Sequence, residues 1–160
     1  MQLQCLLLVS VCVAACAPRA KIETEVLGPP TDFASLRSFA IVATEDASGM
    51  VQRDIEQAIS TRLVEKGLTP MGIDAADMIV VFRASAVEVL KRELDGDPDA
   101  NFYRIAEYTE GTLVIDVFDR AQARRIWHGQ AVLDDRDRAR MWQRKVEAVD
   151  EILAELPVGG

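Results

Sequence analysis

Two carboxylates and one imidazole are the side chains of this sequence best suited to acid-base chemistry. Asp116 and Asp119 lie close together in the chain, and His128 is the only histidine. Two carboxylates can catalyse hydrolysis when one donates a proton and the other activates a water molecule or attacks directly. These two aspartates are three positions apart on a predicted strand, so their side chains point to opposite faces. The spacing argues against a cooperating acid-base pair.

A single histidine restricts the chemistry further. Metal sites that need several imidazoles are excluded, and a Ser-His-Asp triad would have to use His128 itself. Acting alone, His128 could still serve as a general base. In strand alternation it shares a face with Ile126, Gln130 and Val132, which predicts a half-exposed strand residue without a catalytic role.

An acidic segment resembles the beginning of a calcium-binding loop. Its alternating oxygen-bearing side chains are Asp95, Asp97, Asp99 and Asn101. A calcium loop needs glycine at its sixth position and glutamate at its twelfth, where this sequence has Ala100 and Ala106. We therefore interpret the segment as a solvated acidic loop and predict neither a metal site nor a cofactor.

Asp116 is unusual because it interrupts an apolar strand. It shares one strand face with Thr112, Val114 and Phe118. The opposite face carries only apolar side chains, Leu113, Ile115 and Val117, and is the face that helices should cover. Val114, Asp116 and Phe118 then form a candidate binding face. For Asp116 itself, we favour pairing with an arginine such as Arg125 across a hairpin over a binding role.

A basic region precedes the last predicted helix. Its arginines are Arg136, Arg138, Arg140 and Arg144, and they are interleaved with Asp134, Asp135 and Asp137. Cations are unfavourable at the N-terminus of a helix, whereas aspartates can cap it. We interpret the region as a solvated network of ion pairs, with a docking patch for an anionic partner as the alternative.

Composition is typical of one globular domain. The chain has 160 residues, of which 49% are hydrophobic and 28% charged. Its formal net charge of −8 disfavours nucleic-acid binding.

The N-terminal segment predicts export and lipidation. Residues 6–15 form an apolar run that is too short to span a bilayer and is typical of a signal peptide. The run ends in Val13-Ala14-Ala15-Cys16, which resembles the bacterial motif in which the cysteine is lipidated and becomes the first mature residue. Ala17, and not aspartate, follows Cys16, and the resemblance to sorted lipoproteins therefore implies the outer membrane as the location. The alternative is ordinary secretion with cleavage after Ala15.

This interpretation divides the chain into a signal peptide (residues 1–15), a lipidated cysteine with a tether (16–21) and one domain (22–158). Cys5 and Cys12 would be removed with the signal peptide, so no disulfide framework remains.

Hydrophobic periodicity predicts the elements that would hold these side chains. The expected elements are a short edge strand at 22–26, a central strand at 39–43, a helix at 49–66 capped by Gly67, a strand at 78–84, a hairpin of strands 111–119 and 124–133, and a helical stripe from Met141 through Lys145 to Leu156. Residues 87–109 carry no clear pattern. The expected fold is α+β, a mainly antiparallel sheet of four or five strands with two helices packed on one face.

Several stretches together resemble a bacterial lipoprotein family known as domain of unknown function 4136. They are Asp32-Phe33 with 36–40, Ala58-Ile59 through Lys66-Gly67, 77–80, 111–116 leading to Trp127-His128-Gly129, and Val149 with Ile152-Leu153 and Pro157. The resemblance covers nearly the whole mature chain and implies a fold and an envelope location, but no activity.

The expected function is a non-catalytic, outer-membrane-anchored periplasmic lipoprotein. It would work through contacts with an envelope protein, a small ligand or a second copy of itself. The alternative is a small envelope hydrolase that uses carboxylates such as Asp116 and Asp119.

Overall fold

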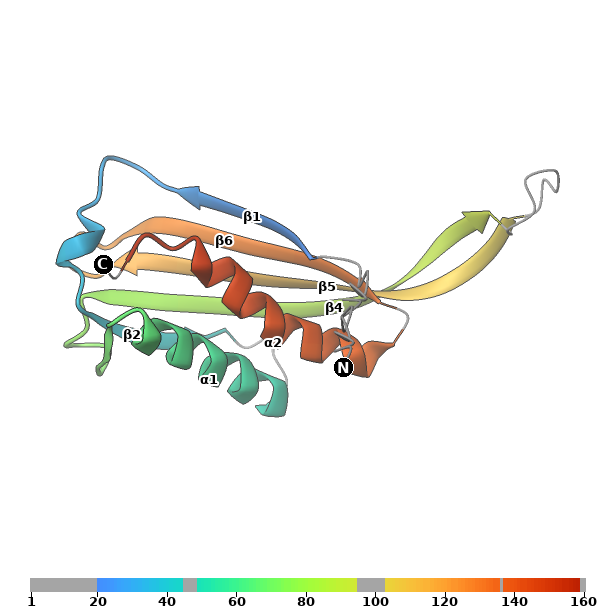
Figure 1. Cartoon of the computed structure of the whole chain (residues 1–160), viewed down its shortest axis with the longest axis horizontal. Coiled ribbons are helices and arrows are strands. Elements are labelled where there is room, and N and C mark those ends of the chain that lie inside the picture. The colour runs from blue at the N-terminus through green and yellow to red at the C-terminus, as the bar shows by residue number, and fades with distance from the viewer. Residues whose placement is uncertain (1–19, 45–48, 95–102, 136, 159–160) are drawn as a thin grey trace, which may run out of the picture.

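The computed structural model describes residues 20–44, 49–94, 103–135 and 137–158 and is shown in Figure 1. In chain order the elements are β1 (Lys21–Val26), a 3-10 turn (Phe33–Ser35), β2 (Ser38–Ala43), α1 (Gly49–Glu65), β3 (Thr69–Pro70), β4 (Met78–Leu94), β5 (Tyr103–Asp119), β6 (Arg124–Asp135) and α2 (Arg138–Ala154). Both helices lie on the same face of one sheet, which confirms the α+β class.

The sheet is larger and more mixed than the sequence pattern predicted. Six strands take the order β1-β6-β5-β4-β2-β3. The pairs among β1, β6, β5 and β4 are antiparallel, whereas β2 is parallel to both β4 and β3. The expected four or five strands are therefore too few, and the sheet, although mainly antiparallel, is mixed because β2 is parallel to its neighbours. Strand β1 is an edge strand, as expected.

The parallel direction of β2 follows from the helix that comes after it. Because α1 carries the chain back along the sheet, the next full strand, β4, starts at the same end as β2 and pairs with it in parallel. The start of β4 is fastened by Asp77, whose carboxylate accepts hydrogen bonds from the Arg37 and Ser38 amides at 2.9 and 3.0 Å. These bonds hold the pKa of Asp77 below its usual value.

Strand β2 is not central, contrary to the expectation for residues 39–43. Only the two-residue strand β3 lies outside it, pairing with Ser38 and Phe39. The run of apolar residues in β2 is explained by its inner neighbour β4 and by the contact of its face with α1.

Both helices end or begin at the positions expected from the sequence. Gly67 follows α1 with a φ of +87°, and the amide of Leu68 returns to the Leu63 carbonyl at 3.1 Å. Asp137 caps α2, because its carboxylate accepts hydrogen bonds from the amides of Ala139 and Arg140.

The core lies between the helices and one face of the sheet. Leu113, Ile115 and Val117 are fully buried there against apolar side chains of the helices, as expected. Gly111 lets α2 approach β5 closely, since a Cβ at this position would lie 2.5 Å from the sulfur of Met141 and 2.6 Å from Cε of Lys145.

Strands β4 and β5 continue past the body of the sheet as a two-stranded ribbon (Figure 1). The ribbon accounts for most of residues 87–109, where the sequence predicted no element. Its apolar side chains include Leu90 and Ile105, which are 73% and 65% exposed. Apolar residues here face solvent on a ribbon with no covering helix, so the usual alternation of buried and exposed positions is lost.

Candidate binding face

The open face of the sheet is the side opposite the helices, and we use this name for Thr112, Val114, Asp116 and Phe118 with their neighbours on β4 and β6. Val81 of β4 and His128 of β6 flank Asp116 in register. Thr112, Val114 and Phe118 are half-buried. The residues between them that point to the helices, Leu113, Ile115 and Val117, are fully buried. The structure thus places all three residues of the predicted binding face together on the open face.

Asp116 is held by three side chains from two neighbouring strands. Its Oδ1 lies 3.0 Å from Nη1 of Arg125 and 2.8 Å from Nδ1 of His128. Its Oδ2 lies 3.6 Å from Nη2 of Arg83 on β4. The predicted pairing of Asp116 with Arg125 is confirmed. These partners leave the Asp116 side chain only 8% exposed, although no helix covers it.

A β-bulge in the hairpin makes this cluster. Val117 is opposite Trp127, but Phe118 is opposite Arg125, so Ile126 is an extra residue on β6. Regular alternation would put Arg125 and His128 on opposite faces, and the bulge brings both to Asp116. Ile126 is fully buried, so the expectation that it shares the face of His128 is wrong. His128 itself is half-exposed, as predicted, with 25% of its side chain accessible.

The cluster has more positive than negative charge. Two guanidinium groups share one carboxylate, and the side chains of Arg83 and Arg125 remain 52% and 43% exposed. A cavity of about 230 Å³ adjoins it, lined by Arg83, Ala84, Ser85, Thr112 and Val114. On β1, Glu25 is opposite His128 and Glu23 is opposite Gln130, so carboxylates border the cluster on that side. An anionic group would approach from the β4 side, where Arg83 and the cavity lie.

The two carboxylates of the hydrolase alternative have separate surroundings. Oδ1 of Asp119 accepts a hydrogen bond from the backbone amide of Gln122 at 3.0 Å, which stabilises the β5–β6 turn. Asp116 is occupied by the cationic cluster, and neither aspartate lines the neighbouring cavity.

The basic region contains part of the predicted ion-pair network. Arg144 donates to the Asp134 carbonyl at 2.7 Å and lies 3.6 Å from the Asp135 carboxylate. Arg140 is exposed, and its amide takes part in the Asp137 cap. Arg136 and the side chain of Arg138 lie outside the part of the chain that the structure describes.

Other sequence predictions also fall outside the described residues. They are the signal peptide, Cys16 and the acidic loop that begins at Asp95. Within residues 20–44, 49–94, 103–135 and 137–158, no group of three or more His, Cys, Asp or Glu side chains could hold a metal ion. Of the helices in that same part, none has the length and apolar character required to cross a membrane.

Sequence reasoning missed Arg83 and the bulge. Arg83 could have been found only by knowing that β4 pairs with β5, which puts it diagonally across from Asp116. Nothing in the sequence marks Ile126 as an extra residue, because Ile126 and Trp127 are both apolar and both buried.

Comparison with solved structures supports the fold. The chain is similar to a PDZ domain protein from Parabacteroides distasonis, with a TM-score of 0.66 and 16% identity over 88% of this chain. It spans 36% of that longer protein. It is also similar to PelC from Paraburkholderia phytofirmans, a dodecamer, with a TM-score of 0.56 and 9% identity over 88% of this chain and 98% of PelC. At these identities the likeness is one of fold alone.

A search of curated proteins found no significant match. The sequence pattern of one family does match, over residues 28–158, and covers every element after β1. The chain therefore belongs to the family described as domain of unknown function (DUF4136).

Proposed function

We propose that this protein is a non-catalytic binding module of the bacterial cell envelope, anchored to the outer membrane by lipid on Cys16 and facing the periplasm. Its working surface is the open face at Val114, Asp116 and Phe118. The partner is an envelope protein, a small ligand or a second copy of the chain. PelC, which is similar in fold, is a dodecamer, and this supports including self-association among the candidates.

The observation that carries this proposal is the enclosure of the Asp116 carboxylate by basic side chains. A catalytic carboxylate needs access to a substrate, but this one is almost fully enclosed by Arg83, Arg125 and His128. Asp116 instead positions Arg83, Arg125 and His128, and these partly exposed side chains, with the half-buried Val114 and Phe118, are the groups that a partner can contact. Such a surface suits recognition, in which charged groups orient a partner and apolar contacts hold it.

The anchor is supported by Val13-Ala14-Ala15-Cys16 at the end of an apolar run. We expect Cys16→Ser to move the protein from the membrane fraction to the soluble fraction, because the acyl chains supply the membrane affinity. Intact-mass measurement of the wild-type protein is the direct check. A mature N-terminus at Ala17, or an unmodified Cys16, would contradict the anchor.

The open face is tested with Phe118→Glu, which places a charge where an apolar contact would be desolvated. We expect this variant to keep the melting temperature of the wild type and to lose its partner. The measurement is cross-linking in intact cells from a photoreactive residue at Val114, followed by thermal melts of the purified variants.

Val64→Glu is the matched control, since Val64 is an exposed apolar residue on α1, away from the open face. It should leave the cross-linked adduct unchanged. Unfolding of Phe118→Glu would show that Phe118 belongs to the core, and an undiminished adduct would show that the partner binds elsewhere.

A further inference from the structure

The outer edge of β2 is incompletely paired. The Met71 amide donates to the Phe39 carbonyl at 2.8 Å, so the backbone groups of Phe39 face β3. The Thr44 amide donates to the Phe82 carbonyl, so the groups of Thr44 face β4. Because backbone direction alternates along a strand, the N–H and C=O groups of Ile41 and Ala43 face outward, as those of Phe39 do. Beyond Phe39, no described strand pairs with them.

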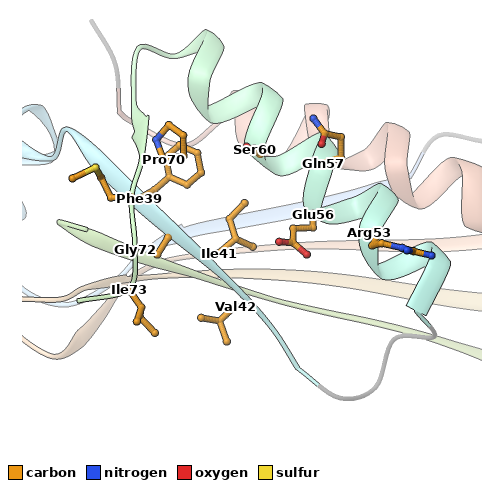
Figure 2. A pocket seen from close by; sticks show the side chains of 12 residues that line it. Phe39, Ile41, Val42, Arg53, Glu56, Gln57, Ser60, Pro70, Gly72 and Ile73 are labelled. Carbon is orange, nitrogen blue, oxygen red and sulfur yellow. The ribbon is translucent and has the colours of Figure 1, made fainter. Parts of the chain in front are cut away.

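A cavity of about 660 Å³ lies at this edge. Strand β2 forms one wall, α1 another, and the segment after β3 a third (Figure 2). Ile41 and Ile73 supply apolar surface to it, and Ile73 is 52% exposed. Unpaired backbone groups next to an apolar hollow are what an extended peptide needs in order to add as a strand.

Two charged side chains of α1 line this cavity, Arg53 and Glu56. In Figure 2 Glu56 extends from α1 towards Ile41, whereas Arg53 extends away from it, so the charge next to the free edge is negative. Within the described residues, no side chain pairs with the Glu56 carboxylate. The chain as a whole is acidic, with a net charge of −8. A Lys or Arg side chain on the incoming strand would supply the missing cation.

We propose that the free edge of β2 at Ile41–Ala43 binds an extended, basic segment of a partner polypeptide by strand addition, with a Lys or Arg of that segment pairing with Glu56. The segment's backbone bonds to Ile41 and Ala43, and its apolar side chains contact Ile41 and Ile73. This edge is distinct from the open face, so the two surfaces can be tested separately.

The probe is a fluorescent hexapeptide of alternating Lys and Val, titrated by anisotropy against the purified mature protein. We expect saturable binding with a Kd below about 1 mM. The Kd should rise at least about tenfold when Glu replaces Lys in the peptide. N-methylation of the peptide residues that face β2 should abolish binding, whereas N-methylation of the alternate residues should not. Hydrogen exchange at the Ile41 and Ala43 amides should slow in the complex.

Ile41→Pro tests the protein side. The Ile41 amide is not used by the sheet, so proline removes the outward donor without breaking a hydrogen bond of the sheet, as is tolerated on edge strands, and it also shortens a side chain that packs against the core. We expect it to weaken peptide binding about tenfold, with Ile41→Val, which keeps the amide, as the matched control. Glu56→Gln should remove the preference for Lys over Glu peptides. If Ile41→Pro does not fold, the N-methylated peptides still test the backbone pairing and Glu56→Gln still tests the charge preference.

Three results would overturn the proposal. The first is no binding of the Lys-Val peptide at about 1 mM, and the second is equal binding of the Glu-Val peptide. The third is sedimentation of the protein as a dimer that Ile41→Pro dissociates, which would assign the edge to a second copy of this chain.

Discussion

Ile115→Ala should lower the free energy of unfolding by about 2 to 5 kcal/mol, while Thr112→Ala on the same strand should lower it by less than about 1 kcal/mol. Ile115 is fully buried under the helices, so truncation leaves a cavity that the packed core cannot close. Thr112 lies on the open face, where its loss leaves space already in contact with solvent.

Urea titration of both variants, with the unfolding slope kept as a check on two-state behaviour, measures this difference. Val117→Ala serves as a second buried position, because Val117 is also fully buried on the covered face. Equal losses for Ile115→Ala and Thr112→Ala would mean that a partner or another copy covers the open face in the purified protein.

The periodic parts of the fold could be predicted because burial leaves a repeating mark on the sequence. The alternation of Leu113, Ile115 and Val117 gave the covered face of β5, and Gly67 gave the end of α1. The direction of β2 was not predicted, because the apolar run at 39–43 does not show which strand is its neighbour. The helix predicted between strands 39–43 and 78–84 is the kind of crossover that a parallel pair needs, and the structure has that pair.

The ribbon escaped prediction for the opposite reason. Leu90 and Ile105 are apolar yet exposed, so neither face of this part of β4 and β5 is marked as buried.

The site was predicted in part. The position of Asp116 in an apolar strand was enough to predict its pairing with Arg125. The bulge at Ile126 and the contact of Arg83 with Asp116 could not be predicted, because both depend on how the strands pair.

Lys145 is the most unusual charged residue of the core. It belongs to the apolar stripe of α2 and is fully buried, its Cε lying beside the backbone of Gly111. The ammonium group donates a hydrogen bond to the Ser85 carbonyl and lies 4.0 Å from the centre of the Trp142 ring. Within the part of the chain that the structure describes, no carboxylate contacts this ammonium group, so its positive charge is only partly compensated. Burial lowers the pKa of Lys145 to about 8.

Lys145→Met should therefore raise the free energy of unfolding at pH 7, by about 1 to 3 kcal/mol. Methionine keeps the length and flexibility of the lysine stem and does not need to be stripped of water. The hydrogen bond to Ser85 and the contact with Trp142 are lost, and these losses offset part of the gain. Lys145→Ala is the matched control, since it also removes the charge but leaves a cavity, and it should be less stable than Lys145→Met.

The pH dependence separates the charge from the packing. Below pH 8 the Lys145 amine is protonated in the folded and unfolded states, so the folded state carries the whole cost of the buried charge. Between about pH 8 and the ordinary pKa of 10.5, the folded protein releases this proton first, and the wild type gains stability relative to Lys145→Met. Denaturant titrations of both proteins from pH 7 to pH 10 should show the advantage of Lys145→Met shrinking as pH rises. An advantage that stays constant would mean that Lys145 keeps its proton across this range and that the variant acts through packing alone.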